Sequence, residues 1–598
     1  MVRARLLGPL ALAVVGAAML PGVASGHAML ERTQPLRGAI TKDAPPRVTF
    51  FFSEPVETVF SAVRVFNARG ERADDGRVTH PGGRDSEVAV GLKTNVVDGT
   101  YTATYRVISA DGHPVSGGFV FSIGNAGPPP QQTVADLTKS GGSTRPTSVP
   151  FTAARALQYA AIAVAVGGLL FVFSAWFGGL REAGGAAAEG ASRAFAQRAR
   201  SIVLSAVVVG ILSGLAGIVL QGAAAAGVST WSAARPSVVS NVLHTEFGSM
   251  WGIRVLVWCL LGGIVLALFA RESVPVLRPA TLSAAGVALA PRFRSRPQAV
   301  ALLAPLLFLV VSPALAGHAH TKAPTAVLIP TNALHVAGMS AWIGGLVMLL
   351  FALPTATRRL ETADRARLLA GVVVRFSTIA GAAVAVLLIT GIVQSLYFVG
   401  LSRHNLLHTS YGQAVLVKIG LLVGLLAFGG LNRQVTVPRL RRLAAAGAAA
   451  GRTGLLLRRA IQAEIALAAV VLGATGVLTG LAPATDELKG PYSATTQLGP
   501  AQLELVVDPA KVGRNLVHLY LINARDGTQY DRAKEVTFAW SLPSKDIGPI
   551  EQVASRAGPG HFVITDATLG VSGRWSLTIG ARVSEFDAYY KKLDISIR

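Results

Sequence analysis

The sequence predicts a multidomain membrane protein, with a polytopic α-helical bundle of about eight transmembrane helices between two β-domains. Three observations predict this fold class. Hydrophobic residues make up 51% of the 598 residues, and the centre of the chain contains repeated apolar stretches of membrane-spanning length. Both flanking regions instead alternate apolar and polar residues, the pattern of half-buried strands. The chain is therefore too large and too apolar for one soluble domain.

The predicted domain boundaries follow changes in composition. Near the N-terminus, two arginines precede an apolar stretch that ends at small residues, which is typical of a signal peptide cut after Gly26. A stretch rich in proline and glycine separates the first β-region from the apolar centre and can act as a flexible linker. The expected parts are a signal peptide at 1–26, a β-domain at 27–124, the linker at 125–150, a transmembrane domain at 151–483 and an extracytoplasmic β-domain at 484–598.

The two β-domains are expected to be antiparallel, the first a small sandwich or barrel and the second sandwich-like. Runs rich in β-branched and aromatic residues are bounded by turn signals such as Asp98-Gly99, which predicts short strands joined by hairpins. Strands are expected at Val48–Phe52, Ala62–Phe66, Thr100–Ile108 and Phe119–Ile123, and again at Leu516–Ile522, Val536–Trp540, Phe562–Thr565 and Arg574–Ile579.

Loop charge predicts the orientation of the membrane domain. The loops after the odd-numbered spans are rich in arginine, whereas the opposite loops contain only Arg235, Lys322 and Arg403 as basic residues. Basic loops remain in the cytoplasm, so both terminal domains are expected on the extracytoplasmic side of the cell membrane. The spans are expected near 152–177, 201–222, 252–270, 299–316, 326–350, 370–397, 413–431 and 460–482.

Composition also excludes several function classes. The net charge of +23 comes mostly from these loops, and no basic face with interleaved aromatic residues predicts nucleic-acid binding. The single cysteine, Cys259, leaves no disulfide within the chain and almost no thiolate metal chemistry. The sequence contains no Walker loop, which argues against a primary pump driven by ATP.

A candidate metal site is predicted in the first β-domain. Cleavage after Gly26 leaves His27 as the first residue, where the α-amine and the imidazole can chelate one ion. Asp111 and His113 add a carboxylate and a second imidazole, and this set of nitrogen and oxygen ligands favours Cu(II). The alternative interpretation is that His27 is incidental to cleavage and that Asp111-Gly112-His113 is a polar turn.

Histidines also mark the membrane domain, and none of them falls in a predicted cytoplasmic loop. His335 lies inside the fifth span and shares a helix face with Met339 and Trp342, so imidazole and thioether together suit copper, including Cu(I). His318 and His320 lie at the outer edge of the membrane, as do His244, His404 and His408. The alternative interpretation is that His335 only bonds a neighbouring helix and that the loop histidines are incidental.

A short segment occurs twice in the membrane domain, at 243–248 and at 407–412, and each copy precedes a basic residue, Arg254 or Lys418. Both copies enter the membrane from the same side, so the repeat is parallel. The favoured interpretation is a helix entry in which the threonine caps the helix and the aromatic residue anchors at the interface, while the base reaches outward. For the two histidines of the repeat, a role beside a pathway between the two copies remains an alternative interpretation.

These motifs resemble a known protein family. Residues 27–124 resemble the CopC copper-binding domain through the start at His27, the Ser53-Glu54-Pro55 segment and the run from Ser109 to Gly117. Residues 151–483 resemble the CopD membrane protein through Gly317-His318-Ala319, His335 to Gly345, Arg375-Phe376-Ser377, Thr390-Gly391 and Thr409-x-Tyr411-Gly412 leading to Lys418. The resemblance implies a fused CopC–CopD copper protein of the bacterial envelope.

The resemblance also implies how the parts act. Carried over from the family, His27, Asp111 and His113 bind Cu(II), and copper then enters the membrane domain, as Cu(I) if a reductant acts first. A separate thioether site is not expected, since Met29 is the only methionine of the first β-domain. The expected function is copper uptake or tolerance without enzymatic activity, with copper, the lipid bilayer, and envelope copper chaperones or a reductant as partners. Two alternatives are a copper-brace oxidase of the polysaccharide monooxygenase type and a transmembrane electron carrier that binds haem.

Overall fold

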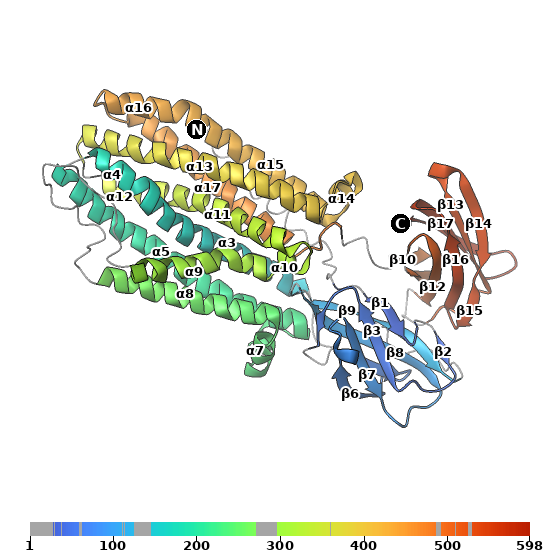
Figure 1. Cartoon of the computed structure of the whole chain (residues 1–598). Coiled ribbons are helices and arrows are strands. Elements are labelled where there is room, and N and C mark those ends of the chain that lie inside the picture. The colour runs from blue at the N-terminus through green and yellow to red at the C-terminus, as the bar shows by residue number, and fades with distance from the viewer. Residues whose placement is uncertain are drawn as a thin grey trace. The chain divides into compact units, whose positions relative to one another are not determined.

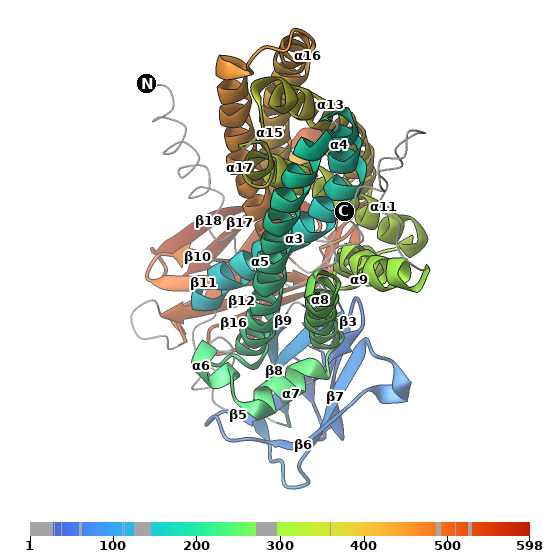
Figure 2. The same cartoon turned by 90° about the vertical axis from the view of Figure 1, so that its left-hand side faces the viewer.

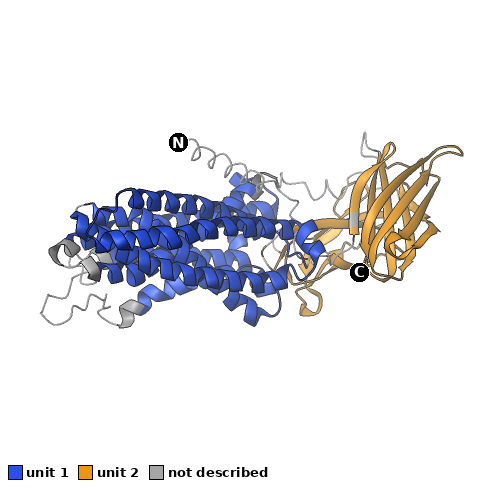
Figure 3. Ribbon diagram, turned by 90° about the horizontal axis from the view of Figure 1, so that it is seen from above, with its two compact units in different colours: residues 1–25, 143–485 blue, residues 26–142, 486–598 orange. Residues whose placement is uncertain are grey.

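The computed structural model divides into two compact units, residues 1–25 with 143–485 and residues 26–142 with 486–598 (Figure 3). The predicted signal peptide lies outside the described residues, as does most of the predicted linker. The structure describes Ala28, Gly112 and residues 30–36, 39–58, 63–110, 114–124, 145–183, 185–270, 296–358, 360–485, 492–508, 510–523 and 529–597.

The N-terminal β-region contains two sheets whose inner side chains form one core. One sheet has the strand order β1-β3-β7-β6 and the other β2-β9-β8-β4, with β5 paired to β8. The ring of Phe50 on β3 lies 5.6 Å from Tyr105 on β8 and 5.4 Å from Phe119 on β9, so aromatic contacts join the two sheets. The strands are β1 (Leu30–Gln34), β2 (Ile40–Thr41), β3 (Arg47–Phe52), β4 (Val56–Glu57), β5 (Val63–Asn67), β6 (Asp74–Thr79), β7 (Glu87–Leu92), β8 (Gly99–Ser109) and β9 (Pro114–Ile123).

The C-terminal β-region also contains two sheets over one core, in the orders β10-β11-β12-β16-β15 and β14-β13-β17-β18. Alternation is clearest in β13, where Val536, Phe538, Trp540 and Leu542 are buried and the residues between them are partly exposed. Its strands are β10 (Tyr492–Leu498), β11 (Ala501–Asp508), β12 (Gly513–Asn523), β13 (Glu535–Leu542), β14 (Ile547–Val553), β15 (Ser555–Gly558), β16 (His561–Leu569), β17 (Gly573–Arg582) and β18 (Ala588–Ile597). All eight strands expected from the sequence are present, apart from Ala62, which lies outside the described residues.

The membrane unit is a bundle of helices (Figure 1). Within the described part of the chain, seven helical stretches are long and apolar enough to cross a membrane. The helices are α3 (Arg145–Phe171), α4 (Phe177–Ala183), α5 (Gly185–Ala226), α6 (Thr230–Ala233), α7 (Pro236–Leu243), α8 (Glu246–Ala270), α9 (Arg296–Leu315), α10 (His318–Thr321), α11 (Thr325–Phe351), α12 (Leu353–Thr357), α13 (Thr362–Phe398), α14 (Arg403–His408), α15 (Ser410–Leu431), α16 (Val437–Ala445) and α17 (Gly451–Leu478), with π-helical turns η2 (Val172–Trp176) and η3 (Asn432–Thr436).

Eight spans are expected, but the described apolar part of the helix at the fourth expected position is shorter than a span. That helix is α9, whose apolar part runs only from Val300 to Leu315 and contains Pro305 and Pro313. Its side chains Leu302, Leu306 and Leu309 are buried in the core of the bundle. The described part of α9 is therefore shorter than the other seven stretches, and the count of eight spans stays a prediction.

Helix α15 presents most of its surface away from the bundle. Leu416, Val417, Ile419 and Val423 are all exposed, although they lie in the middle of an apolar helix. Exposed aliphatic side chains at this depth are suited to contact with lipid tails. The bundle is therefore a multi-pass membrane domain.

Helix α3 runs through the bundle and packs against both α5 and α11 (Figure 2). Helices α3 and α11 approach each other closely, because glycines of each helix contact the backbone of the other. A Cβ atom at Gly167 would overlap the carbonyl oxygen of Ser340, and one at Gly344 would overlap the carbonyl oxygen of Ala163. Small residues at such a crossing let helices pack by van der Waals contact in a membrane.

We expect Gly344→Leu to push α11 away from α3 and to lower the stability of the protein. Overpacking of this kind costs about 1–3 kcal/mol, and more where backbone must move. Thermal unfolding of the full chain in detergent measures the effect. Gly473→Leu on α17 is the matched control, because a Cβ atom there meets nothing within 4 Å. Equal midpoints for the two variants would contradict the close approach of α3 and α11.

Two histidines contact each other on the C-terminal sheet. The Nδ1 atom of His518 on β12 lies 3.1 Å from Nε2 of His561 on β16, and His561 also stacks on Tyr520 at 4.4 Å. Burial, and to a smaller extent the nearby His518, lowers the pKa of His561 to about 3. The folded domain therefore holds His561 neutral at a pH where an unfolded histidine binds a proton.

This pair predicts that the C-terminal domain loses stability in acid. A histidine with a lowered pKa stabilises the fold above its unfolded value near 6.5, and the stabilisation falls by about 1.4 kcal/mol per pH unit below that value. The protection factors of the β12 and β16 amides in the full chain, which correct for the intrinsic pH dependence of hydrogen exchange, should fall between pH 7 and pH 5. His561→Gln should weaken this fall, and protection factors that do not change with pH would show that His561 has no such effect.

Candidate functional site

The predicted ligands Asp111 and His113 fall in the turn between β8 and β9. Both residues lie outside the described residues, but their neighbours define the turn. Ile108 pairs with Pro114, the amide of Gly112 donates to the carbonyl oxygen of Ser109 at 2.8 Å, and Gly112 has φ +85°. Glycine adopts this left-handed conformation without the strain that a Cβ atom would cause. The turn is therefore a tight reversal between two long paired strands.

His27 also lies outside the described residues, and its neighbours lie at the same end of the domain as the turn. Ala28 is fully buried in the core, and Leu30 on β1 pairs with Phe52 at the end of β3. Just beyond Phe52, the carboxylate of Glu54 accepts a hydrogen bond from the hydroxyl of Ser109 at the end of β8. The described residues Leu30 and Ser109 therefore both lie near the end of β3 and the residues that follow it.

His335 is half-buried on α11, where it contacts α13. Its Nδ1 atom lies 2.8 Å from the hydroxyl oxygen of Thr390, and that hydroxyl donates to the carbonyl oxygen of Val386 at 2.6 Å. A hydroxyl that donates its only proton to Val386 accepts from Nδ1–H, which directs the lone pair of the imidazole to Nε2. A second partner of this kind orients a metal-binding histidine in many sites. The sequence did not indicate Thr390 as the partner of His335.

Two further residues on α11 follow His335 toward the opposite end of the helix. Met339 is half-buried and packs against the bundle core, and Trp342 is buried in it. The predicted shared face of His335, Met339 and Trp342 is therefore turned toward the protein. Lys418 on α15 lies close enough to His335 to interact with it electrostatically, a pairing that spans 83 residues and that the sequence did not predict.

The outer histidines differ in their surroundings. His318 on α10 is half-buried, its Nε2–H donates to the carbonyl oxygen of Leu481 at 3.0 Å, and its ring meets Phe398 edge-on. His320 is exposed. His404 and His408 lie one turn apart on α14, both exposed, with ring centroids 4.9 Å apart. The structure therefore makes His318 a packing residue and leaves the other three accessible.

Thr485, where the chain leaves the membrane domain, is held by hydrogen bonds to Lys322 and Phe398 near His318. The hydroxyl of Thr485 accepts a hydrogen bond from the ammonium group of Lys322, and the amide of Thr485 donates to the carbonyl oxygen of Phe398 at 3.2 Å. Among the described residues, no three His, Cys, Asp or Glu side chains are close enough to hold a metal ion together. Any copper site of the described membrane helices therefore uses fewer of these ligands, or includes methionine.

The repeated segment has a structural explanation that is partly the expected one. Thr245 and Thr409 cap α8 and α15, because each hydroxyl accepts from the amide three residues later, at 3.0 Å. The expected interface anchoring is wrong, since Phe247 and Tyr411 are both buried within the protein. The expected outward reach of the base is also wrong for Arg254, which is buried and donates from Nε to the hydroxyl of Ser312 at 3.0 Å.

Comparison with known proteins identifies the family. Family models match the chain as a CopC domain at residues 30–124, a copper resistance protein D-like N-terminal domain at 146–292 and copper resistance protein D at 370–478. The chain is 30% identical over 582 residues to the copper transport protein CutJ of Bacillus subtilis (strain 168), with 95% of each chain covered. This chain belongs to the family of fused CopC–CopD copper resistance and transport proteins.

Other relatives match the two parts of the CopC–CopD fusion separately. Copper resistance protein D of Pseudomonas syringae pv. tomato is 27% identical over 288 residues, which covers 48% of this chain and 84% of that protein. Protein YobA of Escherichia coli (strain K12) is 32% identical over 117 residues, which covers 19% of this chain and 91% of that protein. The resemblance to CopC and CopD inferred from short motifs is thus confirmed, while the individual ligands stay predictions.

Proposed function

We propose that the exported N-terminal domain captures Cu(II) through His27, Asp111 and His113 and that the membrane domain then moves copper past His335 and Met339. The observation that carries the proposal is the orientation of His335 by Thr390 inside a bundle of a copper-transport family. Uptake and tolerance use the same path in opposite directions. Copper is the cargo of this path, and no enzymatic step is needed.

The surroundings of the first site support the capture step. Asp111 and His113 flank Gly112 in the sequence, and Leu30, near the start of the expected mature chain, pairs with Phe52, two residues before Glu54. Amine, imidazole and carboxylate ligands suit Cu(II), the form of copper expected in an oxidising cell envelope. The predicted orientation by loop charge puts the N-terminal and C-terminal domains on that side.

The contacts of His335 support the transfer step. An imidazole at this depth is costly unless it serves a pathway or a partner, and Met339 one turn away supplies a soft ligand for Cu(I). Lys418 repels every cation that approaches His335, so only an ion that gains bonds to nitrogen and sulfur is compensated there. This arrangement favours copper over alkali cations. His320, His404 and His408 supply exposed imidazoles at the outer end, where a chaperone or reductant can deliver the ion.

The two alternative functions fit less well. A copper-brace oxidase needs a ligand set without a coordinating carboxylate, and Asp111 supplies one. A haem-binding electron carrier needs pairs of histidines on facing helices, but in the described membrane helices only His335 lies well inside a span. The names of the relatives refer to copper resistance and copper transport.

The capture site predicts three distinct paramagnetic resonance spectra. The mature chain should bind one Cu(II) ion with a spectrum of mixed nitrogen and oxygen ligation. His27→Ala should lose this signal, and a chain with one extra residue before His27 should change it, because the α-amine is displaced. An unchanged spectrum for the extended chain would remove the amine from the ligand set.

The transfer step predicts reduced copper movement in three variants. We expect His335→Ala and Met339→Leu to abolish or strongly reduce copper flux in cells, and Thr390→Val to weaken it about tenfold, as loss of a second partner does at metal sites. Intracellular copper measured over time gives the flux. Thr378→Val is the matched control, since Thr378 also bonds the backbone of α13 but is exposed and away from His335. Normal flux in His335→Ala would exclude this path.

A further inference from the structure

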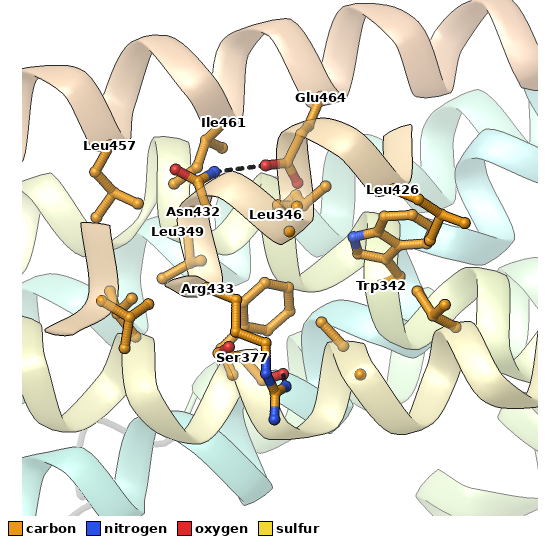
Figure 4. A pocket seen from close by; sticks show the side chains of 18 residues that line it. Trp342, Leu346, Leu349, Ser377, Leu426, Asn432, Arg433, Leu457, Ile461 and Glu464 are labelled. Atoms are coloured by element: carbon orange, nitrogen blue, oxygen red, sulfur yellow. Dashed lines mark hydrogen bonds between the residues drawn. The ribbon is translucent and has the colours of Figure 1, made fainter. Parts of the chain in front are cut away.

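A cavity of about 220 Å³ is lined by Trp342 and Glu464, among others (Figure 4). Helices α11, α13, α15 and α17 line it, mostly with aliphatic and aromatic side chains. Its polar lining consists of Ser377, Asn432, Arg433 and Glu464. The proposed path along α11 therefore leads from His335 and Met339 to a chamber that contains one acidic side chain.

Glu464 is buried in the middle of α17, with 3% of its surface exposed. One of its oxygens accepts a hydrogen bond of 2.6 Å from the side-chain amide of Asn432 (Figure 4). A carboxyl group in a membrane-spanning helix meets the cost of burial by binding a cation or by binding a proton. Among the described residues, no basic nitrogen lies within 4.0 Å of it, and the nearby Arg433 instead donates to the carbonyl oxygen of Ser377 at 2.9 Å.

Asn432 reaches Glu464 from an irregular turn. It begins η3, the π-helical turn that continues α15, and π-turns inside helices are frequently found at functional sites. Asn432 is turned toward α17 and Arg433 toward α13 (Figure 4). The contact between Asn432 and Glu464 therefore lies at the start of this turn.

The chemistry of this cavity favours a proton over a metal ion. Copper in a transport path needs nitrogen or sulfur ligands, whereas the cavity offers one carboxyl and one amide. Arg433 lines the same cavity but donates to Ser377, and Arg458 of α17 lines the second cavity. Other charged groups of the surrounding helices lie elsewhere: Lys418 of α15 is near His335, Arg155 of α3 is near Gly480, and Arg375 of α13 is near Gly178. A proton is therefore the occupant that satisfies Glu464.

A second cavity lies next to the first and extends toward one end of the bundle. It has a volume of about 450 Å³ and shares Leu349, Val373, Leu457 and Ile461 with the first, so these aliphatic side chains stand between the two. Its lining extends to Thr362 and Arg365, which are exposed next to the loop after α12. Loop charge predicts that this end of the bundle faces the cytoplasm. A proton that leaves Glu464 toward this end passes between the shared aliphatic side chains.

We propose that Glu464 binds and releases a proton that it exchanges with the cytoplasmic face, and that copper movement is coupled to this exchange. The carboxylate takes up one proton from water in the cavities and becomes neutral, and it returns the proton by the same route. A copper ion that passes Trp342 is attracted by the ionised carboxylate of Glu464 and not by the neutral acid. The copper ion and the proton therefore take turns beside Glu464. The coupling rests on the proposed copper path, whereas the proton site does not.

The test uses the full chain in liposomes that contain a pH-sensitive dye, with Cu(I) supplied outside together with a reductant. Wild-type protein should move copper and change the internal pH in step with it. Glu464→Gln keeps an oxygen that accepts from Asn432, so it should fold normally, yet its copper-linked pH change should fall to the level of protein-free vesicles. Asn432→Leu removes the amide but keeps the carboxyl, and its pH change should persist.

Two other results would overturn the proton role. The first is a copper-linked pH change that persists in Glu464→Gln. The second is normal copper transport in Glu464→Gln together with loss of copper transport in Asn432→Leu, which is the pattern expected of a purely structural hydrogen bond. If wild-type protein moves no copper, the copper path fails, and infrared spectroscopy decides on the proton site alone. A protonated-carboxyl band that titrates in wild type and is missing in Glu464→Gln supports the site, and its absence from wild type contradicts it.

Discussion

The membrane domain depends on the close approach of α3 and α11. Gly167 and Gly344 let the two backbones touch, and this contact fixes which face of α11 is turned inward. Because α11 is held there, its polar and soft side chains fall in one line, with His335 first, Met339 one turn later and Trp342 above the cavity. The neighbouring helices contribute the other polar groups of this region: Thr390 from α13, Lys418 from α15 and Glu464 from α17. Each of these groups would be costly in a bilayer if the bundle did not enclose it.

Much of the fold was predictable because it depends on short-range patterns. Alternation placed the strands of both β-regions, as in β13, where every second residue is buried. Apolar length placed the seven long spans, whereas α9, which contains Pro305 and Pro313, has a shorter described apolar part. Likewise, Phe247 and Tyr411 looked like interface anchors because a single chain pattern does not reveal that neighbouring helices bury them.

The candidate sites were predictable only where the ligands belong to a local motif. Asp111 and His113 stand beside Gly112 in one turn, and His335 with Met339 follows helix periodicity, so the sequence indicated both sets. Thr390 belonged to the Thr390-Gly391 motif, but neither it nor Glu464 indicated its contact, because the partners lie 55 and 32 residues away in the chain. The contact of Glu464 lies at a π-helical turn that no spacing rule in the sequence predicted. Contacts between side chains of different helices therefore could not be predicted from the sequence alone.

The fastening of Thr485 has a consequence for how this fusion is assembled. The last residue of the helical unit is tied to Lys322 and to the end of α13, and His318 ties α10 to Leu481 just before it. The outer end of the bundle is thus closed by residues that all belong to the membrane domain. Removing everything after Thr485 would break none of these bonds. These bonds therefore hold the end of the helical unit independently of the residues that follow Thr485.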